Sequence, residues 1–243
     1  MPRGGSGAAE HSIARENLRV VLVATRNPLN IGAAARAMRN FGFRHLRLVN
    51  PYRVAYQEAR SAVNAAEILK EAKEFPSLAE AIADCNLVVG TTSLGHRELQ
   101  HPLRSLEYGG RLIRNQLASA KVALLFGSEK FGLSNEDLSY CHWLLRIGTE
   151  GSMNLGQAVA VCLYELTRRR ASGKPESRQR ASAADLERLT ALLTGVLKES
   201  GYVHSGGTDA KIRRLIRRLD LPAHDAEVWL GMIRQIQWKL TRE

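Results

Sequence analysis

Apolar and polar positions alternate in blocks along the first two thirds of the chain, and each block has the length of a strand or a helix. Buried strands are predicted at residues 18–24, at "HLRLVNP" (45–51), and at "NLVVGTTS", "KVALLFGSE" and "WLLRIG". Helices are predicted after the first strand, at 59–70, at 78–84, and over "NLGQAVAVCLYELTRRR". This alternation predicts an α/β fold: a parallel sheet with helices on both faces, and ligands at the carboxyl ends of its strands.

The pattern changes at residues 171–182, "ASGKPESRQRAS", which are small, polar and basic and therefore indicate a linker. Beyond it, three helices are predicted: one over 185–199, one capped by Thr208, and one opened by Pro222. Their expected core positions are Leu186, Leu189, Leu193 and Val196, then Ile212, Leu215, Ile216 and Leu219, then Trp229, Ile233, Ile236 and Leu240. The predicted organisation is a disordered tail (1–17), an α/β domain (18–170), the linker, and a small all-helical domain (183–243) docked on the larger one.

Charge narrows the choice of partners. The chain of 243 residues has 35 Lys and Arg against 24 Asp and Glu, a formal net charge of +11, and an isoelectric point near 10.0. This balance favours an anionic partner, nucleic acid before a membrane, because no basic amphipathic anchor is evident. No apolar stretch is long enough to span a bilayer. Cys85, Cys141 and Cys162 are far apart and form no CxxC, and no HxxxH occurs. Neither a disulfide framework nor a metal site is predicted, which together with the lack of a signal peptide favours the cytoplasm.

The stretch "RNPLNIGAAARAMRNFG" (26–42) is the first candidate for chemistry. With Asn30 as N-cap, positions 31, 34, 35 and 38 face the core, and Gly32, Arg36 and Arg39 lie on the opposite side. A glycine beside two arginines lets a phosphate or ribose approach the backbone while guanidinium groups hold it. An ordinary solvated helix would show the same residues. A dinucleotide turn is excluded because no GxGxxG follows the first strand.

Three further segments follow strand ends. In "LLFGSEKFGLSNED", Glu129 comes directly after a buried strand, Gly132 turns the chain, and Ser134 with Asp137 forms a capping box. In "RIGTEGSMNLGQAV", a polar Ser and Asn introduce a helix, and "TTS" (91–93) ends the third strand. Each segment alone also fits a plain turn or cap.

In combination and order, these segments resemble the signature of the SPOUT-class RNA 2'-O-methyltransferases of the TrmH family. "NIGAAAR" is similar to that family's first motif, "FGSEKFGLSNED" to its second and "SMNLGQAV" to its third. The resemblance covers residues 18–170. "ARAMRNFGFRHLRLVNP", "LSNEDLSYCHW" and "MIRQIQWKL" most resemble the TrmJ type, which methylates the ribose of a pyrimidine (position 32) in the anticodon loop of tRNA. Met153 in place of the usual leucine, and "GTEG" without the usual proline, depart from the family pattern.

The resemblance implies a sheet whose C-terminal part forms a trefoil knot, a homodimer whose active site is shared across the interface, and S-adenosylmethionine as methyl donor without a metal. It implies that the loops 91–93, 126–132 and 147–155 hold this cofactor. The cofactor-binding residues that it implies are Thr91, Thr92, Ser93, Gly127, Ile147, Ser152, Met153, Asn154 and Leu155. The catalytic residues that it implies are Arg36, Asn30, Glu129 and Asn154.

Arg36 matches an arginine proposed to act at the 2'-hydroxyl. Because a guanidinium group stays protonated at neutral pH and is therefore a poor base, we expect Arg36 to bind the adjoining phosphate and polarise the hydroxyl. The residues expected to contact RNA are Arg26, Arg39, Arg213, Arg214, Arg217 and Arg218. Two other functions fit the same residues: methylation of ribosomal RNA, and RNA binding without catalysis on the same scaffold.

Overall fold

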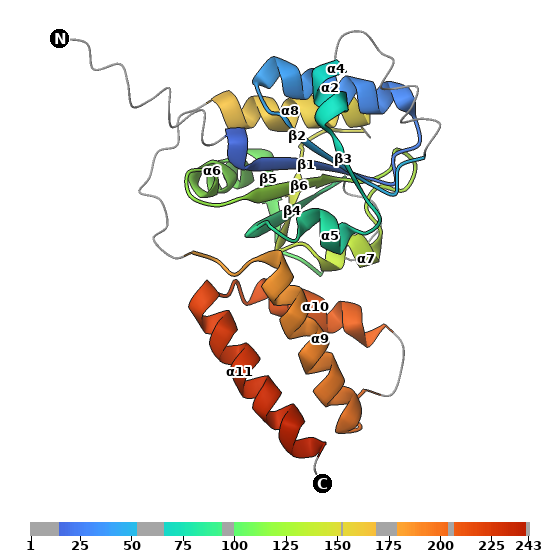
Figure 1. The fold of residues 1–243 in the computed structure, drawn as a ribbon. Coiled ribbons are helices and arrows are strands. Elements are labelled where there is room, and N and C mark those ends of the chain that lie inside the picture. The colour runs from blue at the N-terminus through green and yellow to red at the C-terminus, as the bar shows by residue number, and fades with distance from the viewer. Residues whose placement is uncertain are drawn as a thin grey trace, which may run out of the picture.

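A seven-stranded sheet forms the centre of the protein in the computed structural model, which describes residues 15–52, 66–93, 100–151, 153–168, 179–203 and 207–241 (Figure 1). All its strand pairs are parallel, in the order β3-β2-β1-β6-β4-β7-β5. The strands are β1 (Leu18–Val23), β2 (His45–Val49), β3 (Lys73–Phe75), β4 (Leu87–Thr92), β5 (Leu103–Ser105), β6 (Val122–Phe126) and β7 (Trp143–Arg146). The predicted α/β class is therefore confirmed.

The two central strands are apolar throughout because both of their faces are covered. Every residue of β1 and β6 is buried, as expected for a parallel sheet with helices on either side. One face is covered by α2 (Pro28–Phe41), α4 (Ala66–Glu71), α6 (Leu106–Leu117) and α8 (Leu155–Arg168), and the other by α5 (Leu78–Ile82) and α7 (Asn135–Ser139). Of the predicted helix at 59–70, residues 59–65 lie outside the described part of the chain.

Helix α2 packs closely on α8 because several side chains on its inner face are small. Ile31, Ala34, Ala35 and Met38 are fully buried, as predicted. The N-cap differs from the prediction: it is Asn27, whose side chain accepts from the amide of Leu29, and Pro28 occupies the first turn. Asn30 lies inside that turn and is buried, so its side chain is available for tertiary contacts.

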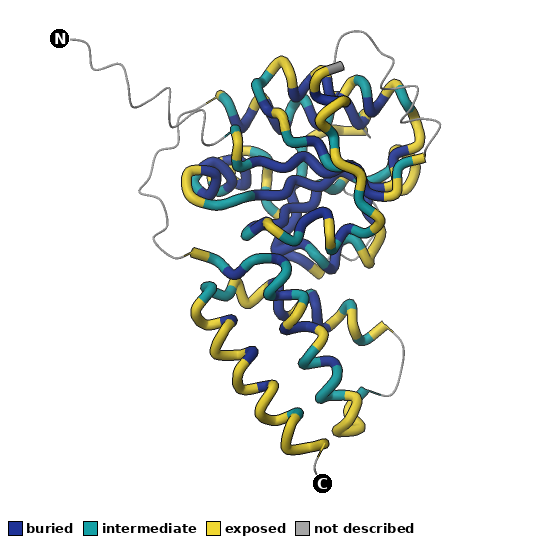
Figure 2. Tube along the Cα trace, viewed as in Figure 1, coloured by how far each residue is buried: buried dark blue, intermediate teal, exposed yellow. Residues whose placement is uncertain are grey.

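The C-terminal helices α9 (Ala183–Glu199), α10 (Thr208–Arg218) and α11 (Ala223–Leu240) form a layer below the sheet (Figure 1). Five of the twelve predicted core positions are buried in the core of this layer: Leu186, Leu189, Ile212, Ile216 and Ile233. Five other predicted core positions are exposed instead: Leu215, Leu219, Trp229, Ile236 and Leu240. The outer face of α11 is accordingly exposed along its length (Figure 2). Thr208 is the first residue of α10 and not its cap.

Backbone hydrogen bonds attach these helices to the sheet layer. The amide of Ala183 donates to the carbonyl of Cys85 (2.7 Å), and that of Ala184 donates to the carbonyl of Ala83 (3.1 Å). The amide side chain of Asn86 donates to the carbonyl of Arg180 at 3.0 Å. The start of α9 is thus fixed beside the end of α5. Residues 1–14 of the predicted tail and 171–178 of the predicted linker lie outside the described ranges.

No helix within the described ranges is both long and apolar enough to cross a membrane.

Candidate functional site

A cavity of about 480 Å³ opens at the carboxyl ends of β4, β6 and β7. This is the position that the α/β pattern predicted for a ligand. Its walls bring together most residues that the family resemblance assigned to the cofactor: Thr91, Thr92, Ser93, Gly127, Ile147, Met153 and Leu155. Asn154 lies beside the cavity wall and bonds to Asn30, whereas Ser152 is outside the described residues. Lys130 and Phe131, which belong to the loop 126–132 that the resemblance assigned to the cofactor, also line the cavity, as do Leu133 and Leu138, which were not predicted.

The turn after β6 forms one wall of this cavity, and its backbone doubles back on itself. The amide of Gly132 donates to the carbonyl of Ser128 (2.8 Å), and Gly132 has a φ of +67°. A Cβ added at Gly127 would lie 2.0 Å from the carbonyl carbon of Gly132, so only glycine fits there. The predicted capping box of Ser134 and Asp137 is present and fixes the start of α7. The wall is therefore built from backbone that approaches the cavity closely.

Three polar side chains from distant motifs meet at the edge of the cavity. The side-chain amide of Asn30 donates to Oε1 of Glu129 at 2.9 Å, and its Oδ1 accepts from Nδ2 of Asn154 at 2.9 Å. Oδ1 of Asn154 in turn accepts from the amide of Gly156, which fixes the start of α8. The backbone amides of Arg26 and Asn27 point to the same carboxylate at 3.4 and 3.3 Å. The network joins the first, second and third motifs into one site.

The Glu129 carboxylate is held in its ionised form. Partial burial raises its pKa, but the hydrogen bonds from Asn30 and from backbone amides outweigh that effect, so its pKa lies below the ordinary value. Glu129 is consequently an anion at neutral pH and accepts hydrogen bonds. It cannot donate a proton there.

The structure does not bring Arg36 into this network. Arg36 and Arg39 are exposed on the outer face of α2, on the side away from the core, as predicted. Arg36 makes no hydrogen bond or ion pair with any described residue and does not line the cavity. Arg26 is also exposed, next to Glu129.

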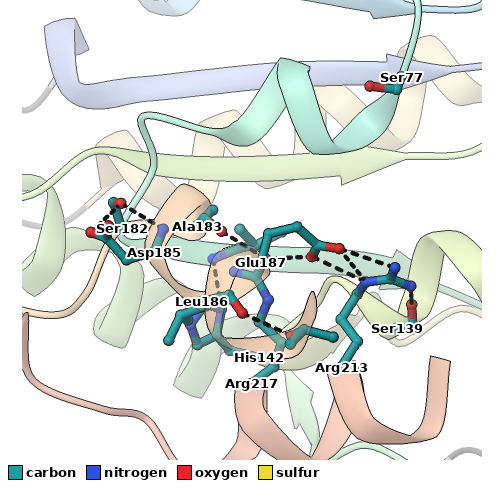
Figure 3. A network of polar contacts seen from close by, with 12 residues as sticks. Ser77, Ser139, His142, Ser182, Ala183, Asp185, Leu186, Glu187, Arg213 and Arg217 are labelled. Carbon is teal, nitrogen blue, oxygen red and sulfur yellow. Dashed lines mark hydrogen bonds and ion pairs between the residues drawn. The ribbon is translucent and has the colours of Figure 1, made fainter. Parts of the chain in front are cut away.

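Two of the arginines expected to contact RNA have a different role. Arg213 and Arg217 point into the contact between α10, α9 and α7, where Glu187 lies between them (Figure 3). Arg213 donates to Glu136 (2.7 Å), to Ser139 (3.0 Å) and to Glu187 (3.1 Å). The Arg217 side chain is 1% exposed, and burial lowers its pKa to about 10, so it stays charged at neutral pH. These partners correct the expectation of a solvent-facing surface.

The other two predicted arginines of α10 lie nearer to solvent. Arg214 is half-buried and contacts the side chain of Gln100, and Arg218 is exposed. The basic surface that α10 presents is therefore smaller than the count of its arginines indicates.

Comparison with known proteins shows the family to which this chain is similar. The model of the SpoU rRNA Methylase family matches residues 17–164. A Yersinia pestis protein described as tRNA (cytidine/uridine-2'-O-)-methyltransferase TrmJ is 36% identical over 237 residues, which cover 91% of each chain. The protein of the same description from Photorhabdus laumondii is 32% identical, covering 91% of this chain and 97% of its own. Among solved structures, TrmJ from Z. mobilis ZM4 superposes with a TM-score of 0.78 at 28% identity, over 90% of this chain and 98% of that one.

Proposed function

The chain belongs to the SpoU rRNA methylase family, and we propose that it methylates the 2'-oxygen of a pyrimidine ribose at position 32 in the anticodon loop of tRNA. The observation that carries this proposal is the Asn30–Glu129–Asn154 network at the edge of the cavity. It assembles residues of all three motifs beside a space large enough for a cofactor. The description of relatives that align over 91% of the chain supports tRNA as the substrate.

The cavity fits S-adenosylmethionine. Its volume of about 480 Å³ lies within the range of small-molecule sites, and it combines apolar side chains with hydroxyl and backbone groups. Thr91, Thr92 and Ser93 would hold the cofactor from one side, and the backbone at Gly127 and Ile147 from the other. When bound, this cofactor supplies a methyl group already activated on a sulfonium. The protein then has mainly to align the ribose oxygen with it.

The polar network performs that alignment. The Asn30 side chain donates a hydrogen bond to Glu129 and accepts one from Asn154. These two bonds hold the first turn of α2 against the wall of the cavity. Ionised Glu129 also accepts from the backbone of 26–27 and thereby holds the loop before α2. These residues position the substrate side of the site.

Arg36 completes the site from a partner subunit in this proposal. Its place on the exposed face of α2, away from the cavity of its own chain, supports a homodimer in which one subunit's arginine serves the other's active site. There it would bind the phosphate next to the target ribose and polarise the hydroxyl. Arg26 and Arg39 extend the same positive surface.

The proposal includes the domain organisation and the knot. Residues 18–170 would form the methyltransferase domain, and residues 183–243, joined by the linker 171–182, a helical domain that contacts RNA through exposed cations such as Lys211 and Arg218. The chain crosses from β6 past β4 to β7 and returns through α8 to α2, a path that supports a trefoil knot. The site of action would be the cytoplasm.

Methyl transfer from labelled S-adenosylmethionine to purified RNAs tests the proposal. We expect transfer to unmodified tRNA, at the 2'-oxygen of position 32, and that modification should be missing from cells that lack the gene. Transfer to ribosomal RNA alone, the substrate in the family's description, would overturn tRNA as the substrate. Calorimetry that detects no binding of S-adenosylmethionine would instead indicate a non-catalytic RNA-binding protein.

A further inference from the structure

The rim of the cavity carries an exposed aromatic side chain. Phe131 lines the cavity, yet it is 66% exposed, an unusual position for a phenylalanine that could pack into a core. It occupies the turn between Gly127 and Gly132, two residues after the Glu129 carboxylate of the polar network. The ring is therefore part of the cavity lining and is also largely exposed to solvent.

The turn that carries Phe131 is held from several directions. The amide of Phe131 donates to Oγ of Ser128 at 3.3 Å, and the amide of Gly132 donates to the Ser128 carbonyl at 2.8 Å. Glu129 in the same turn is fixed by Asn30. A ring mounted on such a turn loses little conformational freedom when a ligand covers it, which favours binding.

The surroundings of the ring are those of a nucleic-acid contact. Nζ of Lys130 lies 5.2 Å from the centre of the Phe131 ring. Leu29 at the start of α2 is 77% exposed, and Tyr52, whose amide donates to the carbonyl of Thr25, is 59% exposed. Glu129 accepts hydrogen bonds from the backbone amides of Arg26 and Asn27, so the exposed Arg26 and the start of α2 lie next to the turn that carries Phe131. Exposed rings interleaved with cations are typical of surfaces that bind single-stranded nucleic acid.

We propose that Phe131 is the stacking platform for the base of the nucleotide whose ribose is methylated. This inference rests on the proposed function and names how the site grips its substrate. A ribose oxygen can reach the cavity only if its nucleotide leaves the stack of the RNA loop, and the base then needs an apolar surface. The ring provides that surface beside the polar network. Stacking on it accepts cytosine and uracil alike, because it reads the face of a base and not its hydrogen-bonding edge.

The cofactor is the competing occupant of the ring, because Phe131 also lines the cavity. The high exposure of the ring and the neighbouring Lys130 favour RNA: an adenine buried in the cavity would need a ring that faces inward, and a cation attracts a polyanion. The two possible occupants predict that a change of the ring lowers the affinity for different ligands. A ring that stacks on the cofactor affects cofactor affinity, and a ring that stacks on the target base affects tRNA affinity.

Substitution of Phe131 separates these cases. We expect Phe131→Leu, which keeps an apolar side chain without a π face, to weaken tRNA binding about 10-fold and to raise the KM for tRNA equally, with kcat changed much less. Phe131→Tyr and Phe131→Trp should retain near-normal binding. The calorimetric Kd for S-adenosylmethionine should be the same in all four proteins.

A tRNA that lacks the base at the methylated position is the matched substrate control. The wild-type protein should bind it about as weakly as Phe131→Leu binds intact tRNA, and the substitution should cause no further loss. Equal tRNA binding by Phe131→Leu and wild type overturns the inference, as does a loss of cofactor affinity of the same size. Binding of tRNA is read by filter retention, so the stacking is tested even if the wild-type protein fails to transfer methyl groups. That failure would refute only the proposed function.

Discussion

Gly127→Ala is the substitution whose effect follows most directly from the structure. A Cβ at this position would lie 2.0 Å from the carbonyl carbon of Gly132 and 2.1 Å from the amide nitrogen of Leu133. Both neighbours are backbone atoms, and Cβ atoms in real structures stay beyond 3.0 Å. No side chain can rotate away to make room. The turn between Gly127 and Leu133 has to open by about 1 Å to admit the methyl group.

The size of the effect follows from what this opening moves. The turn carries Glu129 and lines the cavity, so its displacement shifts one wall relative to Asn30. Misplacing groups by about 1 Å in a site of this kind costs on the order of 100-fold in rate. Overpacking of a tight backbone contact costs about 1–3 kcal/mol in the free energy of unfolding. We therefore expect kcat/KM to fall about 100-fold, with weaker binding of S-adenosylmethionine and a modest loss of stability.

Gly148→Ala is the matched control. Gly148 follows β7 near the same cavity, a Cβ added to it would meet no atom within 4 Å, and its φ is not positive. Calorimetry with S-adenosylmethionine, methyl transfer to tRNA and urea unfolding should leave this variant close to wild type. If Gly127→Ala bound the cofactor as tightly as Gly148→Ala while losing stability, the close backbone approach would serve packing alone, and the cofactor assignment of this wall would be refuted.

Three further experiments test the polar network, the helical layer and the pH dependence of stability. Asn30→Asp should destabilise the protein by about 1–3 kcal/mol more than Asn30→Ala at pH 7, because it places a carboxylate against Glu129. Urea unfolding should show that this difference in the free energy of unfolding becomes smaller at acidic pH, where the carboxylates are protonated. Arg213→Ala should cost about 2–3 kcal/mol, since it removes one of the two arginines paired with Glu187 and the arginine paired with Glu136, whereas the exposed Arg218→Ala should cost less than about 0.5 kcal/mol. Burial, reinforced by a nearby arginine, lowers the pKa of His142 to about 3. Its contribution to stability is therefore present above its ordinary pKa and is lost as the pH falls from about 6.5 toward 3, and acid unfolding of His142→Gln should be less steep.

The sequence predicted the centre of the fold because the buried strands are continuous apolar runs. The elements that it did not predict have no such pattern. β3 and β5 are three residues long and mostly exposed, so nothing in their composition distinguishes them from loops. α6 contains Gly109 and Gly110, which weaken any helical prediction, yet both are required by packing: a Cβ on Gly109 would lie 2.4 Å from Leu145. That requirement comes from tertiary structure.

The site was predicted in part for a similar reason. Motifs that follow strand ends meet because parallel strands share one carboxyl edge, so Asn30, Glu129 and Asn154 could be expected close together. The N-cap was assigned to Asn30 instead of Asn27 because either asparagine can cap a helix, and Pro28 allows the earlier start. Phe131 was predicted only as part of the cofactor loop 126–132, because one aromatic residue in a turn has no periodicity that would single it out. Only its exposure at the rim of the cavity points to a ligand.

The arginines of α10 mark the point where pattern reasoning fails on physical grounds. Arg213 and Arg217 are four residues apart and share a helix face, just as Leu215 and Leu219 do, so periodicity supports either face as the buried one. The choice depends on Glu187 of α9 and Glu136 of α7, whose carboxylates compensate the buried cations. α7 also carries Leu138, which lines the cavity. One short helix therefore connects the ion pairs that attach the helical layer with a wall of the cavity.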